Sequence, residues 1–156
     1  MAISGVANVA ALAFGPGSYP SWYFVLVAIG YGLLLPALAV LQVRHATLRQ
    51  SGAILGTAAG MATITVGIAA SSNADLVVPA LFVRGIWWWT IGKLWFETGL
   101  MPRLFGVATM VLAVIAIGAA LASAPMTMDA ATLWTSERVV LGLWSLALAF
   151  FLGRSR

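Results

Sequence analysis

The chain alternates between long apolar stretches and short polar connections. Five stretches are long enough to cross a bilayer as helices, at about residues 22–43, 52–70, 76–96, 104–124 and 133–152. An apolar run of about 20 residues is typical of a transmembrane helix, because a helix of that length spans the hydrocarbon layer. We therefore predict an all-α fold, a polytopic transmembrane bundle of about five spans, with residues 1–156 forming a single transmembrane domain.

Two features modify this pattern near the N-terminus. Pro36 lies inside the first stretch, where a proline removes a backbone N–H donor, so we expect a kink there. Residues 1–20 are apolar, but their uninterrupted run is short and lacks the basic residues that open a signal peptide. We predict that this segment is interfacial and ends at the turn around Pro16.

The positive charges predict the orientation of the bundle. One end carries Arg44, His45, Arg49, Lys93, Arg103, Arg154 and Arg156. The other end carries Asp75, Asp129, Glu137 and Arg138, without net positive charge. Lysine and arginine are retained on the cytoplasmic side of membranes. The N-terminus is therefore expected outside and the C-terminus in the cytoplasm.

The composition is typical of a membrane protein and excludes several kinds of binding site. The chain is 62% hydrophobic and 8% charged, far from soluble domains, and its mean hydropathy is +1.03. Its net charge of +4 comes from scattered basic residues, so we expect no nucleic-acid partner. The absence of cysteine and the single histidine, His45, exclude thiolate metal sites and a haem held by two histidines of this chain.

Glycines form two stripes that suit close helix packing. The second stretch has a glycine at every fourth position, and the third has glycines seven apart: Gly52, Gly56 and Gly60, then Gly85, Gly92 and Gly99. Small residues let helices approach closely in lipid. We predict that the two stripes pack together. The alternative is that the first stripe faces a second copy or another subunit.

Arg84 lies about two turns inside the third stretch, too deep for a simple interfacial anchor. A charge at that depth is unfavourable unless it is paired or hydrated. Asp75 and Glu137 are candidate partners at the same end, and Trp88 can add a cation–π contact. We favour an ion pair between Arg84 and Glu137 that ties two helices. A ligand or ion site around Arg84 is the alternative.

Lys93 and Glu97 lie four residues apart near the cytoplasmic end of the same stretch. This spacing allows an ion pair within a helix, and both side chains can extend to the interface. An interfacial salt bridge is the favoured interpretation, and a proton relay is the alternative. Trp95 and Phe96 are expected to belong to the aromatic belt at that interface.

Trp87, Trp88 and Trp89 fall near the middle of the span, away from either belt. Consecutive helical residues point about 100° apart, so the three rings cannot share one environment. We expect bulky packing opposite the glycine-rich second stretch. The alternative is contact with a partner protein, or with a pigment, quinone or lipid as cofactor.

From about Trp95 onward the chain resembles an uncharacterised bacterial multi-pass membrane family, a domain of unknown function. That family carries a Leu/Ile-Pro-Arg-Trp-Leu motif between two spans and an Asn-Glu before a Leu-Trp-rich last helix. The matching residues here are Pro102, Arg103, Glu137, Leu143 and Trp144, over roughly 60 residues. Leu104 and Ser136 depart from the motifs. The resemblance implies a multi-pass protein of the bacterial plasma membrane, and no activity.

No arrangement of residues suggests catalysis. The chain has four acidic residues, no serine or threonine at a meaningful spacing from His45, and no phosphate-binding loop or HExxH motif. We therefore expect no enzyme activity. The favoured hypothesis is a structural or accessory subunit of a larger membrane complex, such as a respiratory or photosynthetic one. The alternative is a small-molecule or ion transporter component with Arg84, Lys93 and Glu97 lining a path.

Overall fold

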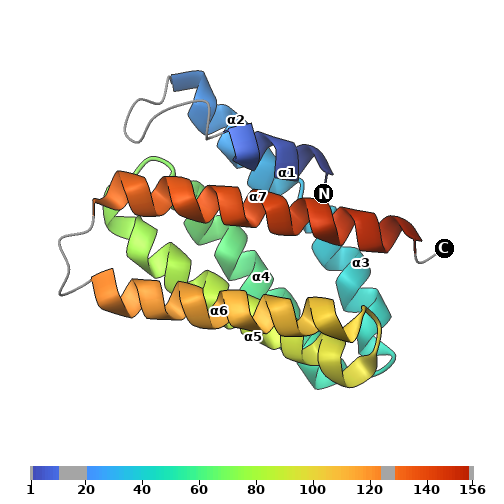
Figure 1. Ribbon diagram of the computed structural model, residues 1–156. Coiled ribbons are helices and arrows are strands. Elements are labelled where there is room, and N and C mark those ends of the chain that lie inside the picture. The colour runs from blue at the N-terminus through green and yellow to red at the C-terminus, as the bar shows by residue number, and fades with distance from the viewer. Residues whose placement is uncertain (1, 11–20, 124–128, 155–156) are drawn as a thin grey trace.

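The fold is built entirely from helices in the part of the chain that the structure describes. A computed structural model describes residues 2–10, 21–123 and 129–154. Figure 1 shows the arrangement of the helices α1 (Ala2–Val9), α2 (Ser21–Gly32), α3 (Leu35–Ala46), α4 (Gln50–Ala70), α5 (Val77–Thr98), α6 (Arg103–Ser123) and α7 (Ala130–Arg154). A short 3₁₀ helix, η2 (Ala74–Leu76), precedes α5.

Five of these helical segments are long and apolar enough to cross a membrane. They are Trp22–Ala46, Gln50–Ala70, Ala74–Thr98, Arg103–Ser123 and Thr132–Gly153, of 21 to 25 residues each. At about 1.5 Å per residue, each covers the roughly 30 Å of a hydrocarbon core. The protein is therefore a multi-pass, all-α membrane bundle, and each predicted span matches an observed one within about three residues.

The first span is interrupted where the sequence predicts a kink. Helix α2 ends at Gly32, and Leu33 and Leu34 form a turn before α3. Pro36 is at the start of α3 and has no N–H to donate to Gly32. The chain tightens instead, with the N–H of Leu34 bonded to the carbonyl of Tyr31 at 2.9 Å.

Helix α5 lies at the centre of the bundle and packs most closely against α6. α5 also contacts α4 and α7. A Cβ placed on Gly92 would lie 2.8 Å from the carbonyl oxygen of Gly106, and one on Gly106 would lie 2.9 Å from the carbonyl oxygen of Gly92. The backbones of α5 and α6 therefore touch at this crossing, as small residues allow in membranes.

The two glycine stripes do not pack against each other, so that prediction is wrong. Gly85 and Gly92 face α6, where they meet Ile117 and Gly106. In the other stripe, Gly52 faces Leu94, Gly56 faces Ile91, and Gly60 faces Leu38 and Trp87, so these glycines accept large side chains from α5 and α3. Gly99 takes no part in packing; its φ of 68° ends α5.

Helix α1 packs against the middle of α7. A Cβ on Gly142 would lie 2.8 Å from the carbonyl oxygen of Gly5 and 2.9 Å from Cγ2 of Val9. In Figure 1, α1 and α2 lie on the side of α7 away from α6. The interfacial placement of residues 1–20 stays a prediction, and residues 11–20 lie outside the described part.

We expect Gly92→Ala to destabilise the bundle, because the new methyl group would press on the backbone of α6. Overpacking of this kind costs about 1–3 kcal/mol. The measurement is the free energy of unfolding in mixed detergent micelles. Gly118→Ala on α6 is the matched control, since no atom lies within 4 Å of its added Cβ. Equal stability of the two variants would contradict the close α5 and α6 contact.

The orientation can be tested by cysteine labelling, because the chain has no native cysteine. Ser72 and Thr47 are exposed in connections at opposite ends of the bundle. With Ser72→Cys, a membrane-impermeant maleimide should react in intact cells. With Thr47→Cys, it should react only after permeabilisation. The opposite pattern would invert the predicted orientation.

Candidate functional site

Arg84 is fully buried at the meeting point of three helices. Its guanidinium forms an ion pair with Glu137 of α7, whose side chain is 3% exposed. Nη2 donates a hydrogen bond to the hydroxyl of Tyr31 on α2 at 2.5 Å. The guanidinium carbon lies 5.6 Å from the ring centroid of Tyr31 and 5.8 Å from that of Trp88. Of the two partners considered from the sequence, Glu137 is the one that Arg84 binds.

This arrangement neutralises a charge that the membrane interior would otherwise exclude. Arg84 presents a planar fork of N–H donors, which Glu137, Tyr31 and the ring of Trp88 surround. These groups come from α7, α2 and α5 itself. The pair therefore links the first, third and fifth spans. Its burial and its use of an internal acid are the marks of a structural tie.

Arg138 provides a second buried charge, although its position in the sequence predicts only that it lies at the outer end. It is fully buried, and its guanidinium carbon lies 5.2 Å from the ring centroid of Tyr23 and 5.3 Å from that of Trp134. Because Arg138 directly follows Glu137, it points about 100° away around α7. Glu137 thus faces α5 while Arg138 faces α2, and one turn of α7 contacts both.

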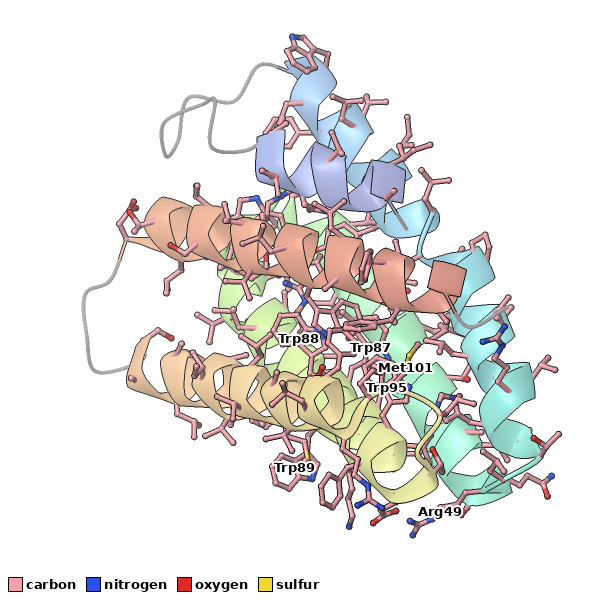
Figure 2. All side chains as sticks on the ribbon, turned by 45° about the vertical axis from the view of Figure 1, so that its right-hand side comes forward. Arg49, Trp87, Trp88, Trp89, Trp95 and Met101 are labelled. Atoms are coloured by element: carbon pink, nitrogen blue, oxygen red, sulfur yellow. The ribbon has the colours of Figure 1, made fainter. Side chains whose placement is uncertain are left out.

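A cluster of aromatic rings fills the space between α5, α6 and α7. Trp144 of α7 lies with its ring centroid 5.4 Å from Trp87, 5.7 Å from Trp88 and 6.1 Å from Trp95. Phe105 of α6 stacks on Trp95 at 5.3 Å. The indole N–H of Trp144 donates to Thr109 at 3.1 Å. Figure 2 shows Trp87, Trp88 and Trp95 pointing into this interior.

The three consecutive tryptophans divide as their helical spacing requires. Trp87 and Trp88 are buried, whereas Trp89 is 46% exposed and points away from the bundle (Figure 2). Trp87 lies against Gly60 of α4, so it does pack on the glycine-rich second span. The placement of Trp95 in an interfacial belt is wrong, because this ring is fully buried. Its neighbour Phe96 is 44% exposed.

An apolar cavity of about 220 Å³ lies beside the buried ion pair. Arg84 and Trp88 line its α5 side, Ile115 and Ala116 its α6 side, and Val140 its α7 side. The lining is almost wholly carbon, so the charged atoms of the pair are turned away from the cavity. Such a space suits an apolar group rather than water or an ion.

A second set of charges lies at the predicted cytoplasmic end. Glu97 forms an ion pair with Arg49, which is the residue before α4, and its other oxygen lies 3.8 Å from Nζ of Lys93. These side chains are a third to a half exposed. They line a groove of about 270 Å³ between α4 and α5. Lys93 and Glu97 therefore share one groove, and Arg84 lines a different cavity.

The fold brings to these sites several groups that the sequence pattern does not mark. Tyr31 was hidden because its hydroxyl is one polar atom in an apolar run, although a tyrosine in the middle of a span is itself a signal. Arg49 was read only as a topological charge, since its pairing depends on how α4 meets α5. His45 is buried, with Nδ1 2.6 Å from the carbonyl oxygen of Leu41.

The described residues offer no cluster of three or more histidine, cysteine or acidic side chains able to hold a metal ion. Comparison with protein-family models, curated proteins and solved structures finds no match. The likeness of the C-terminal part to a bacterial membrane family therefore stays a prediction.

A double-mutant cycle on Arg84 and Glu137 should show strong coupling. Arg84→Met or Glu137→Leu alone leaves one buried charge without its partner, which costs about 3–5 kcal/mol. The double variant removes both charges and should recover much of that loss. The measurement is the free energy of unfolding in mixed micelles.

The same cycle on Arg49 and Glu97 is the matched control, because this pair is partly exposed. Exposed pairs contribute about 0–1 kcal/mol. Additive losses for Arg84→Met and Glu137→Leu would show that the buried pair does not stabilise the bundle.

Proposed function

We propose that this protein is a non-catalytic accessory subunit of the bacterial plasma membrane, one that packs against a larger membrane complex. Respiratory and photosynthetic assemblies are the candidate complexes. The bundle contributes packing surface to its partner. The proposal needs no resident cofactor in this chain, although a lipid, quinone or pigment at the interface is compatible with it.

One observation carries the proposal: Arg84, Lys93 and Glu97, the charged side chains that a transport path would use, have partners within the protein itself. Arg84 is engaged by Glu137 and Tyr31, and Glu97 by Arg49 and Lys93. Groups paired in this way hold helices together. A packing role uses all of them as they stand.

The face formed by α6 and α7 is the surface we assign to the partner. Figure 1 shows these two helices side by side, and between them lies the apolar cavity beside Arg84. α6 is the least buried of the five spans, and no charged residue occurs from 104 to 123. Ile115 and Leu121 are 60% and 65% exposed. Lipid or protein can cover such an apolar face, and a partner displaces lipid only where its surface packs closely against the helices.

The transporter alternative is favoured by one feature, the interruption of the first span next to Pro36. A path lined by Arg84, Lys93 and Glu97 requires these side chains in one connected space. They line two separate spaces, one between α6 and α7 and one between α4 and α5. The accessory role is therefore the better supported of the two proposals.

Site-specific photo-crosslinking in native membranes tests the accessory role. A benzophenone amino acid at position 115 should form a discrete adduct with one membrane polypeptide, identified by mass spectrometry. Position 25 on α2 is the matched control, because Val25 and Ile115 are both 60% exposed. It should give lipid adducts alone.

Lipid adducts alone at position 115 would contradict the proposal. A crosslink to a second copy of the chain would replace it with self-association. Val140→Cys separates the transporter alternative, because Val140 lines the cavity. Reaction of that cysteine with a water-soluble maleimide would indicate a hydrated path.

A further inference from the structure

The groove between α4 and α5 has charged residues at one end and apolar residues at the other, which matches the headgroup and acyl chain of a phospholipid. Arg49 and Glu97 lie at its aqueous end. Lys93 follows one turn deeper, and Leu55 and Trp89 line the deepest part. Leu55 is 57% exposed and Trp89 is 46% exposed, so both apolar side chains face outward toward lipid. The groove therefore changes from charged to apolar along the membrane normal.

This groove stays open because a glycine, which has no side chain, lies in its wall. Gly52 lines it, and a Cβ there would lie 3.0 Å from Leu94 and 3.6 Å from the side chain of Arg49. Any larger residue at position 52 would project into the space between the two helices. The volume of about 270 Å³ thus depends on a glycine that also sets the spacing of α4 from α5.

The charges at the rim leave one net positive charge. Glu97 bridges Arg49 and Lys93, and this places the two cations on either side of one carboxylate. Their side chains are 51% and 56% exposed, so both retain surface for another anion. A single phosphate group would make the set neutral. The charge of the groove is therefore complementary to one phosphodiester.

We propose that this groove binds an anionic phospholipid of the cytoplasmic leaflet. The phosphate lies between Arg49 and Lys93, and an acyl chain runs along Leu55 and Trp89. Basic pockets between spans on the cytoplasmic side are typical sites for acidic headgroups. The apolar half distinguishes a lipid from free phosphate, which has nothing to place against a leucine and an indole ring.

Lipid quenching of tryptophan fluorescence tests the proposal on the full chain in phosphatidylcholine nanodiscs. Brominated phosphatidylglycerol should quench at lower mole fraction than brominated phosphatidylcholine, by about fivefold for one net positive charge near the surface. Trp89→Phe should remove the difference between the two lipids, because Trp89 lines the groove.

Lys93→Gln and Arg49→Gln should each bring the two lipids to about equal quenching. Lys93→Gln is the safer variant, since its contact with Glu97 is long at 3.8 Å. Gly52→Leu keeps both cations but fills the groove, and it should also abolish the preference. Arg103→Gln is the matched control, because Arg103 lies at the same end and does not line the groove.

Three outcomes would overturn the proposal. Equal quenching by the two lipids in the unmodified protein would show no preference. An equal effect of Arg103→Gln and Lys93→Gln would indicate a diffuse surface charge instead of a site. The third outcome is that millimolar inorganic phosphate removes the lipid preference while the Gly52→Leu variant keeps that preference. This result would show a phosphate site without an acyl chain.

Discussion

The burial of one positive charge inside the bilayer constrains this bundle more than any other feature. Arg84 is fully buried, and an unpaired guanidinium at that depth would be strongly unfavourable. It is accommodated because Glu137 and Tyr31 reach it from α7 and α2. Any rearrangement that separates those helices must also expose the charge. The ion pair therefore selects one arrangement of spans from the many that apolar helices alone would permit.

The bundle combines two ways of joining helices. Between α5 and α6 the backbones touch at Gly92 and Gly106, and no side chain intervenes. Between α5 and α7 large aromatic rings fill a wider gap, centred on Trp144. The narrow contact fixes distance, and the aromatic one fixes the rotation of α7 through ring stacking. The apolar cavity lies between α6 and α7 at a place where neither a backbone contact nor an aromatic ring joins them.

The sequence was sufficient to predict the spans and the main ion pair. It was insufficient to predict which helices pack against each other. Hydropathy is a property of one segment, so span limits follow from residue counts. The choice of Glu137 for Arg84 follows because a buried cation has few possible acids in so weakly charged a chain. The helix that packs against a glycine stripe is harder to predict than the partner of a buried charge. Several neighbouring helices can pack against a small residue. The placement of Trp95 in a belt is wrong for the same reason, because the sequence does not show which helices cover its ring.

The contact between Gly5 and Gly142 joins α1 and α7, the first and last helices of the described chain. A ribosome delivers the first of these residues long before the last span exists. Until α7 is synthesised, the face of α1 that carries Gly5 has no α7 to pack against. The same order applies to Arg84, whose hydroxyl acceptor on α2 is synthesised early and whose partner carboxylate on α7 is synthesised late. The arrival of α7 thus completes both the contact with α1 and the ion pair of Arg84.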